Sequence, residues 1–121
     1  MSMSQIGSLC DEQGGIVCVS LGDLREAVGA GKLGRWVLQD IREELEATGL
    51  GYFPKPLLEE NDEPRQHQDI RVYRKGTGTL ARAIDAVLDP SVRGDDHLRD
   101  LGNDNARETL VQVRRLVETD R

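Results

Sequence analysis

Three side chains that can recognise nucleic-acid bases recur along one predicted helix. Arg35, Gln39 and Arg42 are spaced i, i+4 and i+7, which places them on one helix face. Arginine can contact guanine in bidentate fashion, and glutamine can contact adenine in the same way. An ordinary solvated face is the alternative, and on it Arg42 would form an i, i+4 ion pair with Glu46. The spacing therefore leaves base recognition and a solvated face open.

A second group of candidate residues lies in a basic segment at 65–82, which has five basic residues against one acidic residue. The basic residues are Arg65, Arg71, Arg74, Lys75 and Arg82. The net charge of this segment is +4 in a chain of net charge −6, so the remaining residues carry −10. Guanidinium groups bind phosphate oxygens and fix position without reading sequence. The same side chains could instead pair with the acidic loop at 59–63 or contact an acidic partner protein.

No catalytic, nucleotide or metal site is expected from the sequence. The glycine-rich turn at 29–34 has Leu33 after Lys32, where a phosphate-binding loop needs Ser or Thr. His67 and His97 are far apart in the chain, and the two cysteines do not have the close spacing of zinc ligands. The sequence therefore predicts a protein that is not an enzyme and has no cofactor.

The elements that must position these residues are short strands and helices, in a chain long enough for one domain. Short β-branched or aromatic runs predict strands, and leucine and valine at helical spacing predict helices. The predicted order is strand, helix, helix, strand, strand, helix, over residues 16–19, 21–28, 33–48, 50–53, 70–74 and 79–88. Residues 1–15 show no periodicity and are predicted to form a flexible tail. A final helix is predicted within a C-terminal extension at 91–121.

This order resembles a winged helix-turn-helix domain over residues 19–74. The sequence that carries the resemblance is VSLGDLREAVGAGKLGRWVLQDIREELEATGLGYFP. It is also similar to winged modules attached to bacterial restriction-type proteins, whose second helix likewise ends in Gly-Leu before a strand. The resemblance implies an α+β winged helix-turn-helix domain at 16–90, with a small β-hairpin wing and a C-terminal helical extension.

The resemblance also implies which residues bind DNA. In that superfamily the second helix enters the major groove, and the wing contacts the DNA backbone. This implies base contacts by Arg35, Gln39 and Arg42. It implies phosphate contacts by Lys32, Arg71, Arg74 and Lys75. The chain departs from this pattern in one respect, because its second helix has a net charge of −2. DNA phosphates would repel the carboxylates of that helix.

Two functions of different class follow. The first is binding of double-stranded DNA by a bacterial or phage regulator. The second is a protein-interaction adaptor on the same scaffold, favoured by the acidic balance of the chain. Trp36 is expected to be a half-buried core anchor, and an exposed Trp36 would instead be a hot spot for a partner. The stripe of Leu110, Val113 and Val117 either packs on the domain or forms a homodimer.

A cytoplasmic location is expected. No apolar run reaches the ~20 residues of a membrane span, so no membrane partner is predicted. The first ten residues also lack the basic start and apolar stretch of a signal peptide.

Overall fold

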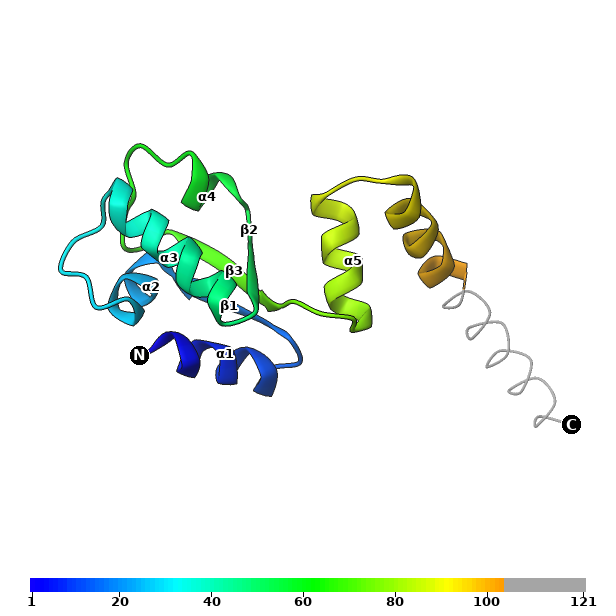
Figure 1. Ribbon diagram of the computed structural model, residues 1–121, viewed down its shortest axis with the longest axis horizontal. Helices are drawn as coiled ribbons and strands as arrows, with labels where there is room; N and C mark the ends of the chain where they lie inside the picture. The colour runs from blue at the N-terminus through cyan, green and yellow to red at the C-terminus, as the bar shows by residue number, and fades with distance from the viewer. Residues whose placement is uncertain (104–121) are drawn as a thin grey trace, which may run out of the picture. The chain divides into compact units, whose positions relative to one another are not determined.

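A three-stranded antiparallel sheet organises the first part of the chain (Figure 1), in a computed structural model that describes residues 1–103. The strands are β1 (Ile16–Ser20), β2 (Leu50–Phe53) and β3 (Asp69–Arg74), with β3 in the middle. Ile70 and Val72 of β3 are completely buried, because their side chains lie on the face of the sheet that carries the hydrophobic core. The predicted strands are confirmed, and the fold of this part is α+β.

Two helices follow β1, as the leucine and valine spacing predicts. They are α2 (Leu21–Ala27) and α3 (Arg35–Ala47). The Ser20 hydroxyl accepts a hydrogen bond from the Asp23 amide at 3.0 Å, and the Asp23 carboxylate accepts one from the Ser20 amide at 3.0 Å. This reciprocal pair is a capping box at the start of α2. Gly29 has a φ of 74° just beyond α2, which glycine adopts without strain.

The N-terminal segment is a helix and not the flexible tail predicted for residues 1–15. α1 (Met3–Glu12) lies against the sheet, and its Ile6 and Cys10 are completely buried. The prediction was wrong because the buried side of α1 includes Gly7 and a cysteine, which a count of large apolar residues overlooks.

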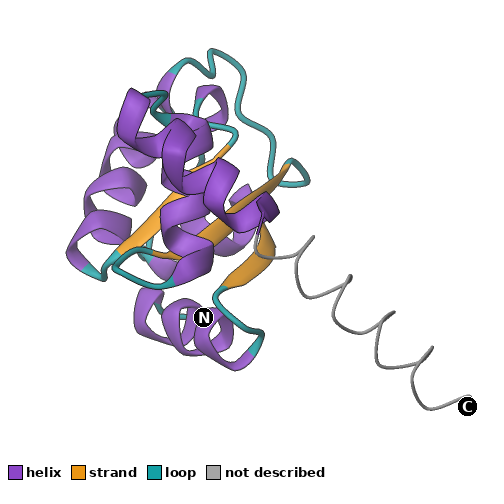
Figure 2. Cartoon of the chain, turned by 90° about the vertical axis from the view of Figure 1, so that its right-hand side faces the viewer, coloured by secondary structure: helices purple, strands orange, loops and turns teal. Residues whose placement is uncertain are grey.

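The helices α1, α2 and α3 pack on one face of the sheet (Figure 2). Val17 and Val19 of β1 point into this core, whereas Cys18 between them is exposed. The buried side of α3 consists of Leu38, Ile41 and Leu45. Each fully buried Leu or Ile contributes about 2 kcal/mol through removal of apolar surface from water. The opposite face of the sheet carries Cys18 and Arg71 as exposed, directly paired residues.

A short helix interrupts the acidic connection between β2 and β3, where the sequence predicts only a loop. It is α4 (Pro56–Glu59), and its Leu58 is buried against α3. Proline at the first position suits a helix start, because its missing amide would have no partner there. α4 therefore anchors the acidic loop beside α3.

The chain divides into two compact units, Met1–Ala81 and Arg82–Arg121. The division falls within α5 (Thr79–Leu88), earlier than the domain end at residue 90 that the sequence predicts. Residues 92–103 are helical and pack on α5, where the backbone of Gly94 approaches Ala86 closely. The predicted helix carrying Leu110, Val113 and Val117 lies outside the described residues, so homodimerisation through it stays a prediction.

None of the helices within residues 1–103 combines the length and the apolar character that a membrane span requires.

Replacing Gly51 by alanine is expected to destabilise the N-terminal unit by about 1–2 kcal/mol. Gly51 is paired with Tyr73 across the β2–β3 ladder, and a Cβ at Gly51 would lie 2.6 Å from the Tyr73 Cε1 and hydroxyl oxygen. The buried Tyr73 ring would have to move to make room. Chemical denaturation measures the effect. Gly31→Ala is the control, because no atom lies within 4 Å of its added Cβ, and an equal loss there would contradict the prediction.

Candidate functional site

The first turn of α3 presents a large aromatic side chain to solvent. Trp36 is 74% exposed, so the expectation of a half-buried core anchor is wrong. The core side of α3 is centred on Leu38, and a residue two positions away lies about 200° round the helix. Trp36 therefore points away from the core. The expectation was wrong because helical spacing alone does not show how far the buried side extends, and Val37, the next residue, is only partly buried.

The three predicted base-contact residues do lie along one side of α3. Arg35 and Gln39 are exposed, and the Gln39 amide donates to the Glu43 carboxylate at 3.2 Å. Arg42 is different, because its Nη1 donates to the backbone carbonyl of Leu58 in α4 at 2.8 Å. Arg42 therefore ties α3 to α4 through one terminal nitrogen, unlike Arg35 and Gln39, and its contact with a base stays a prediction.

A groove of about 470 Å³ separates the N-terminal half of α3 from the acidic loop. Arg35, Gln39 and Arg42 line one side of it. The other side consists of Leu58, Glu59, Glu60, Asn61, Asp62 and Pro64. This second wall of the groove was not predicted from the sequence. The signal that could have found it is the apolar pair Leu57-Leu58 inside an otherwise acidic loop, which predicts a buried turn.

Hydrogen bonds hold the acidic wall in place. The Tyr52 hydroxyl donates to the Glu59 carboxylate at 2.7 Å, which connects β2 to α4. Burial, together with this hydrogen bond to an anion, raises the pKa of Tyr52. The Asn61 amide donates to the Gln68 side-chain oxygen at 3.0 Å, which connects the loop to the start of β3. The wall is therefore tied to the sheet at both ends.

The electrostatic balance around the groove is negative. Residues 35–47 contain two arginines and four carboxylates, a net charge of −2. Residues 56–63 contain four carboxylates and no basic residue, a net charge of −4. DNA phosphates would be repelled by this surface, whereas a basic segment of a protein would be attracted to it.

Arg74 is a structural residue and not the predicted phosphate contact. Its guanidinium donates to both oxygens of the Asp11 carboxylate, at 2.9 and 3.0 Å. The same group donates to the backbone carbonyl of Thr48 at 2.7 Å and to that of Gly7 at 3.2 Å. Arg74 thus ties the sheet to α1 and to the end of α3. The absence of a side chain on Gly7 makes the approach possible, since a Cβ there would lie 3.0 Å from Nη2.

The remaining predicted phosphate contacts do not gather at one place. Arg71 is paired with Phe53, next to the β2–β3 connection. Lys75 lies at the opposite end of this hairpin, where its amide donates to the Gly49 carbonyl at 3.0 Å. Lys32 is exposed in the turn between α2 and α3. Arg71 is therefore the member of the predicted set that lies beside the tip of the hairpin.

Replacing Asp11 by asparagine is expected to lower stability at neutral pH and to have a diminishing effect in acid. Hydrogen bonds from Arg74, followed by its positive charge, lower the pKa of Asp11. A carboxylate whose pKa is lower in the folded state contributes stability that is fully present above its unfolded pKa of about 3.9. That contribution is lost as pH falls through the folded pKa. Denaturation midpoints of Asp11→Asn and the parent chain across this range measure the difference.

Glu12→Gln is the control for this measurement, since Glu12 is an exposed neighbour on α1 with no hydrogen bond or ion pair to a residue in the range 1–103. A difference between Asp11→Asn and the parent chain that does not change with pH would contradict the prediction.

Within residues 1–103, no three side chains from His, Cys, Asp or Glu come together as a metal site would require. The exposed aromatic ring, the groove and its carboxylates are therefore the features on which a function can be argued. Comparisons with protein-family models, curated proteins and solved structures found no match to this chain.

Proposed function

We propose that the Met1–Ala81 unit is a winged helix-turn-helix module that binds another protein and is not an enzyme. The order α1-β1-α2-α3-β2-β3 and the sheet order β1-β3-β2 support the winged-helix assignment (Figure 1). In this assignment α3 is the helix that would read DNA in a regulator, and the β2–β3 connection is the wing. The Trp36 surface, meaning Trp36 with Arg35, Gln39 and the adjoining groove, is the binding surface.

The observation that carries this proposal is the exposure of Trp36 at 74%. Tryptophan is enriched among residues whose truncation costs the most binding free energy at protein interfaces. A large ring that faces water contributes little to the core and is available to a partner, and tryptophan is favoured at interfaces because it combines a large apolar body with a polar N–H. Trp36 does not line the groove, but its neighbours on α3, Arg35 and Gln39, do, and the groove supplies a concave surface into which a partner side chain can insert.

The charges on this surface favour a basic protein partner over DNA. Two of the seven predicted DNA contacts, Arg42 and Arg74, donate their hydrogen bonds within the chain. Carboxylates of the acidic wall lie across the groove from Arg35. A partner segment with Lys or Arg next to an apolar residue would match both the carboxylates and the tryptophan ring. A cation can also lie on the face of the indole ring.

DNA binding is the second candidate, and one feature favours it. Gly34 precedes α3 and gives it no side-chain cap, and the first turn of α3 has no acidic residue. The free amides at such a helix start attract phosphate. Exposed Lys32 and Arg35 lie beside this end of α3. In a bacterial or phage regulator, this N-terminal end of α3 would contact the DNA.

A selection from a random peptide library on the full chain tests the first candidate. Enriched sequences are expected to combine Lys or Arg with Leu, Ile or aromatic residues. Trp36 is the single tryptophan of the chain, so its emission reports occupancy of the surface directly. A blue shift is expected on binding, because the ring leaves water. Enrichment of acidic peptides, or an unchanged emission with the selected peptides, would overturn the proposal.

A salt titration of binding to duplex DNA tests the second candidate. Four cations of the predicted set, Lys32, Arg35, Arg71 and Lys75, are exposed, and contact by all four predicts a log–log slope of about −3.6. Such a slope, with loss of affinity in Arg35→Gln, would establish DNA as the ligand. No binding at low salt would exclude it.

A further inference from the structure

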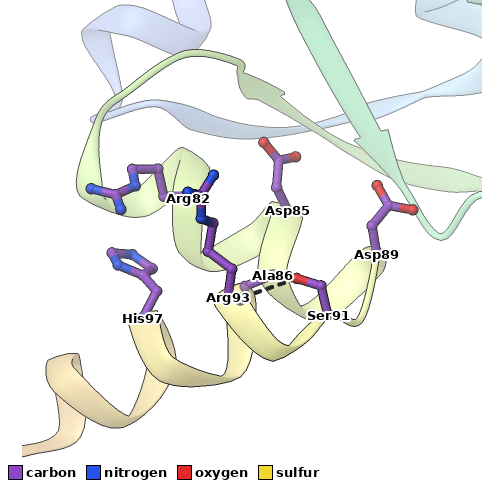
Figure 3. A pocket seen from close by; sticks show the side chains of 8 residues that line it. Arg82, Asp85, Ala86, Asp89, Ser91, Arg93 and His97 are labelled. Carbon is purple, nitrogen blue, oxygen red and sulfur yellow. Dashed lines mark hydrogen bonds between the residues drawn. The ribbon is translucent and has the colours of Figure 1, made fainter.

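The C-terminal unit contains a pocket of about 280 Å³ between α5 and the helix at 92–103 (Figure 3). Its lining residues are Arg82, Asp85, Ala86, Asp89, Ser91, Arg93, Gly94 and His97. The Ser91 hydroxyl accepts from the Gly94 amide at 2.9 Å and so caps the second helix. Arg93 and His97 are spaced i, i+4 on that helix, which brings both side chains to the side that faces Arg82 of α5.

Two arginines give one side of this pocket a positive charge. The side chains of Arg82, Arg93 and His97 extend toward the same side in Figure 3, and the carboxylates of Asp85 and Asp89 lie on the other side. Neither arginine forms a hydrogen bond or ion pair with another residue in the described range 1–103. Asp85 and Asp89 take part in interactions of their own. The two guanidinium groups are therefore available for an anion.

The imidazole of His97 is the second observation that indicates a ligand. Its Nε2 is shielded from solvent and has no hydrogen-bond partner within the part of the chain that the structure describes. Buried polar atoms in folded proteins nearly always have a partner. An oxygen of an anion in the pocket would accept a hydrogen bond from this nitrogen when it carries the proton. The start of the helix at 92 adds a favourable dipole at the same place.

We propose that this pocket binds a phosphate group, as inorganic phosphate or as a small phosphomonoester. A phosphate has several acceptor oxygens in tetrahedral arrangement, which suits two guanidinium forks and one imidazole. The second helix begins beside the pocket, and the positive end of its dipole favours an anion there. This site lies within the C-terminal unit and does not depend on the protein-binding function proposed for the Met1–Ala81 unit.

The test is a titration of the full chain with inorganic phosphate at constant ionic strength, followed by amide chemical shifts in NMR spectra. Saturable shifts are expected at residues 91–97. Arg82→Gln and Arg93→Gln should each raise the dissociation constant for phosphate about tenfold, because each removes a charge-assisted hydrogen bond. A parallel titration with a sugar phosphate distinguishes the two sources, since tighter binding of the ester would identify a phosphomonoester as the ligand.

Arg99→Gln is the matched control. Arg99 lies on the same helix, pairs with Asp96 at 2.9 Å and does not line the pocket, so its replacement should leave the dissociation constant unchanged. The melting temperature of each variant separates lost binding from lost folding. Three results would overturn the proposal: no saturable shift at residues 91–97, equal weakening by Arg99→Gln, or normal binding by the folded Arg82→Gln and Arg93→Gln variants.

Discussion

Trp36→Ala is expected to weaken binding of the partner peptide about 30-fold or more and to leave the free energy of unfolding nearly unchanged. A hot-spot truncation costs at least about 2 kcal/mol of binding free energy, and each ~1.4 kcal/mol is tenfold in the dissociation constant. Stability should change by less than about 0.5 kcal/mol, since the ring is 74% exposed and contributes little to the core. Calorimetric titration measures the first quantity, and chemical denaturation measures the second.

Trp36→Phe is the conservative variant for this experiment, and Glu44→Ala is its control. Phenylalanine keeps an aromatic surface and should retain much of the affinity. Glu44 is an exposed residue of α3 that does not line the groove, so its replacement should have a small effect. Equal affinity of Trp36→Ala and the parent chain would show that the partner does not contact the first turn of α3.

Arg74→Met is expected to lower the free energy of unfolding by about 3 kcal/mol. Methionine keeps much of the side-chain length but removes the hydrogen bonds to Asp11, Thr48 and Gly7. Hydrogen bonds to charged groups contribute about 1.5–3 kcal/mol, and the two carbonyls would lose their partner. Because Arg74 connects α1 to the sheet, hydrogen exchange in α1 should also accelerate.

Arg71→Met is the matched control for Arg74→Met. Arg71 lies on the same strand with its side chain exposed on the other face of the sheet, and it should change stability by less than about 0.5 kcal/mol. Equal losses in the two variants would show that any arginine of β3 has the same role, which would contradict the structural assignment of Arg74.

The sequence predicted the elements whose signals are local. The β-branched run of β1 and the helical spacing of leucine and valine in α2 and α3 each report on neighbouring residues, so they are visible without a fold. α1 was missed because its buried side is completed by Gly7 and by Cys10. The importance of these two residues appears only when the helix lies on the sheet.

The candidate site was harder to predict because it depends on contacts between distant segments. The side shared by Arg35, Gln39 and Arg42 was identified correctly, and all three line the groove. The hydrogen bond between Arg42 and the Leu58 carbonyl could not be predicted, because it joins residues from two separate helices. The sequence likewise could not show that Asp11, 63 positions earlier, would engage Arg74. A guanidinium that completes a fold and one that binds a ligand look the same in a sequence.

The burial of Cys10 makes the reactivity of its thiol a measure of how often α1 separates from the sheet. The Cys10 thiol donates to the Val72 carbonyl at 3.6 Å, and burial is the main cause that raises its pKa. Alkylating reagents attack the thiolate and need access to it, so Cys10 can react only when α1 has separated from the sheet. Cys18 is exposed throughout and reacts without any opening. The ratio of the two labelling rates therefore measures how often the first helix leaves the domain, in the unmodified chain and without an introduced probe.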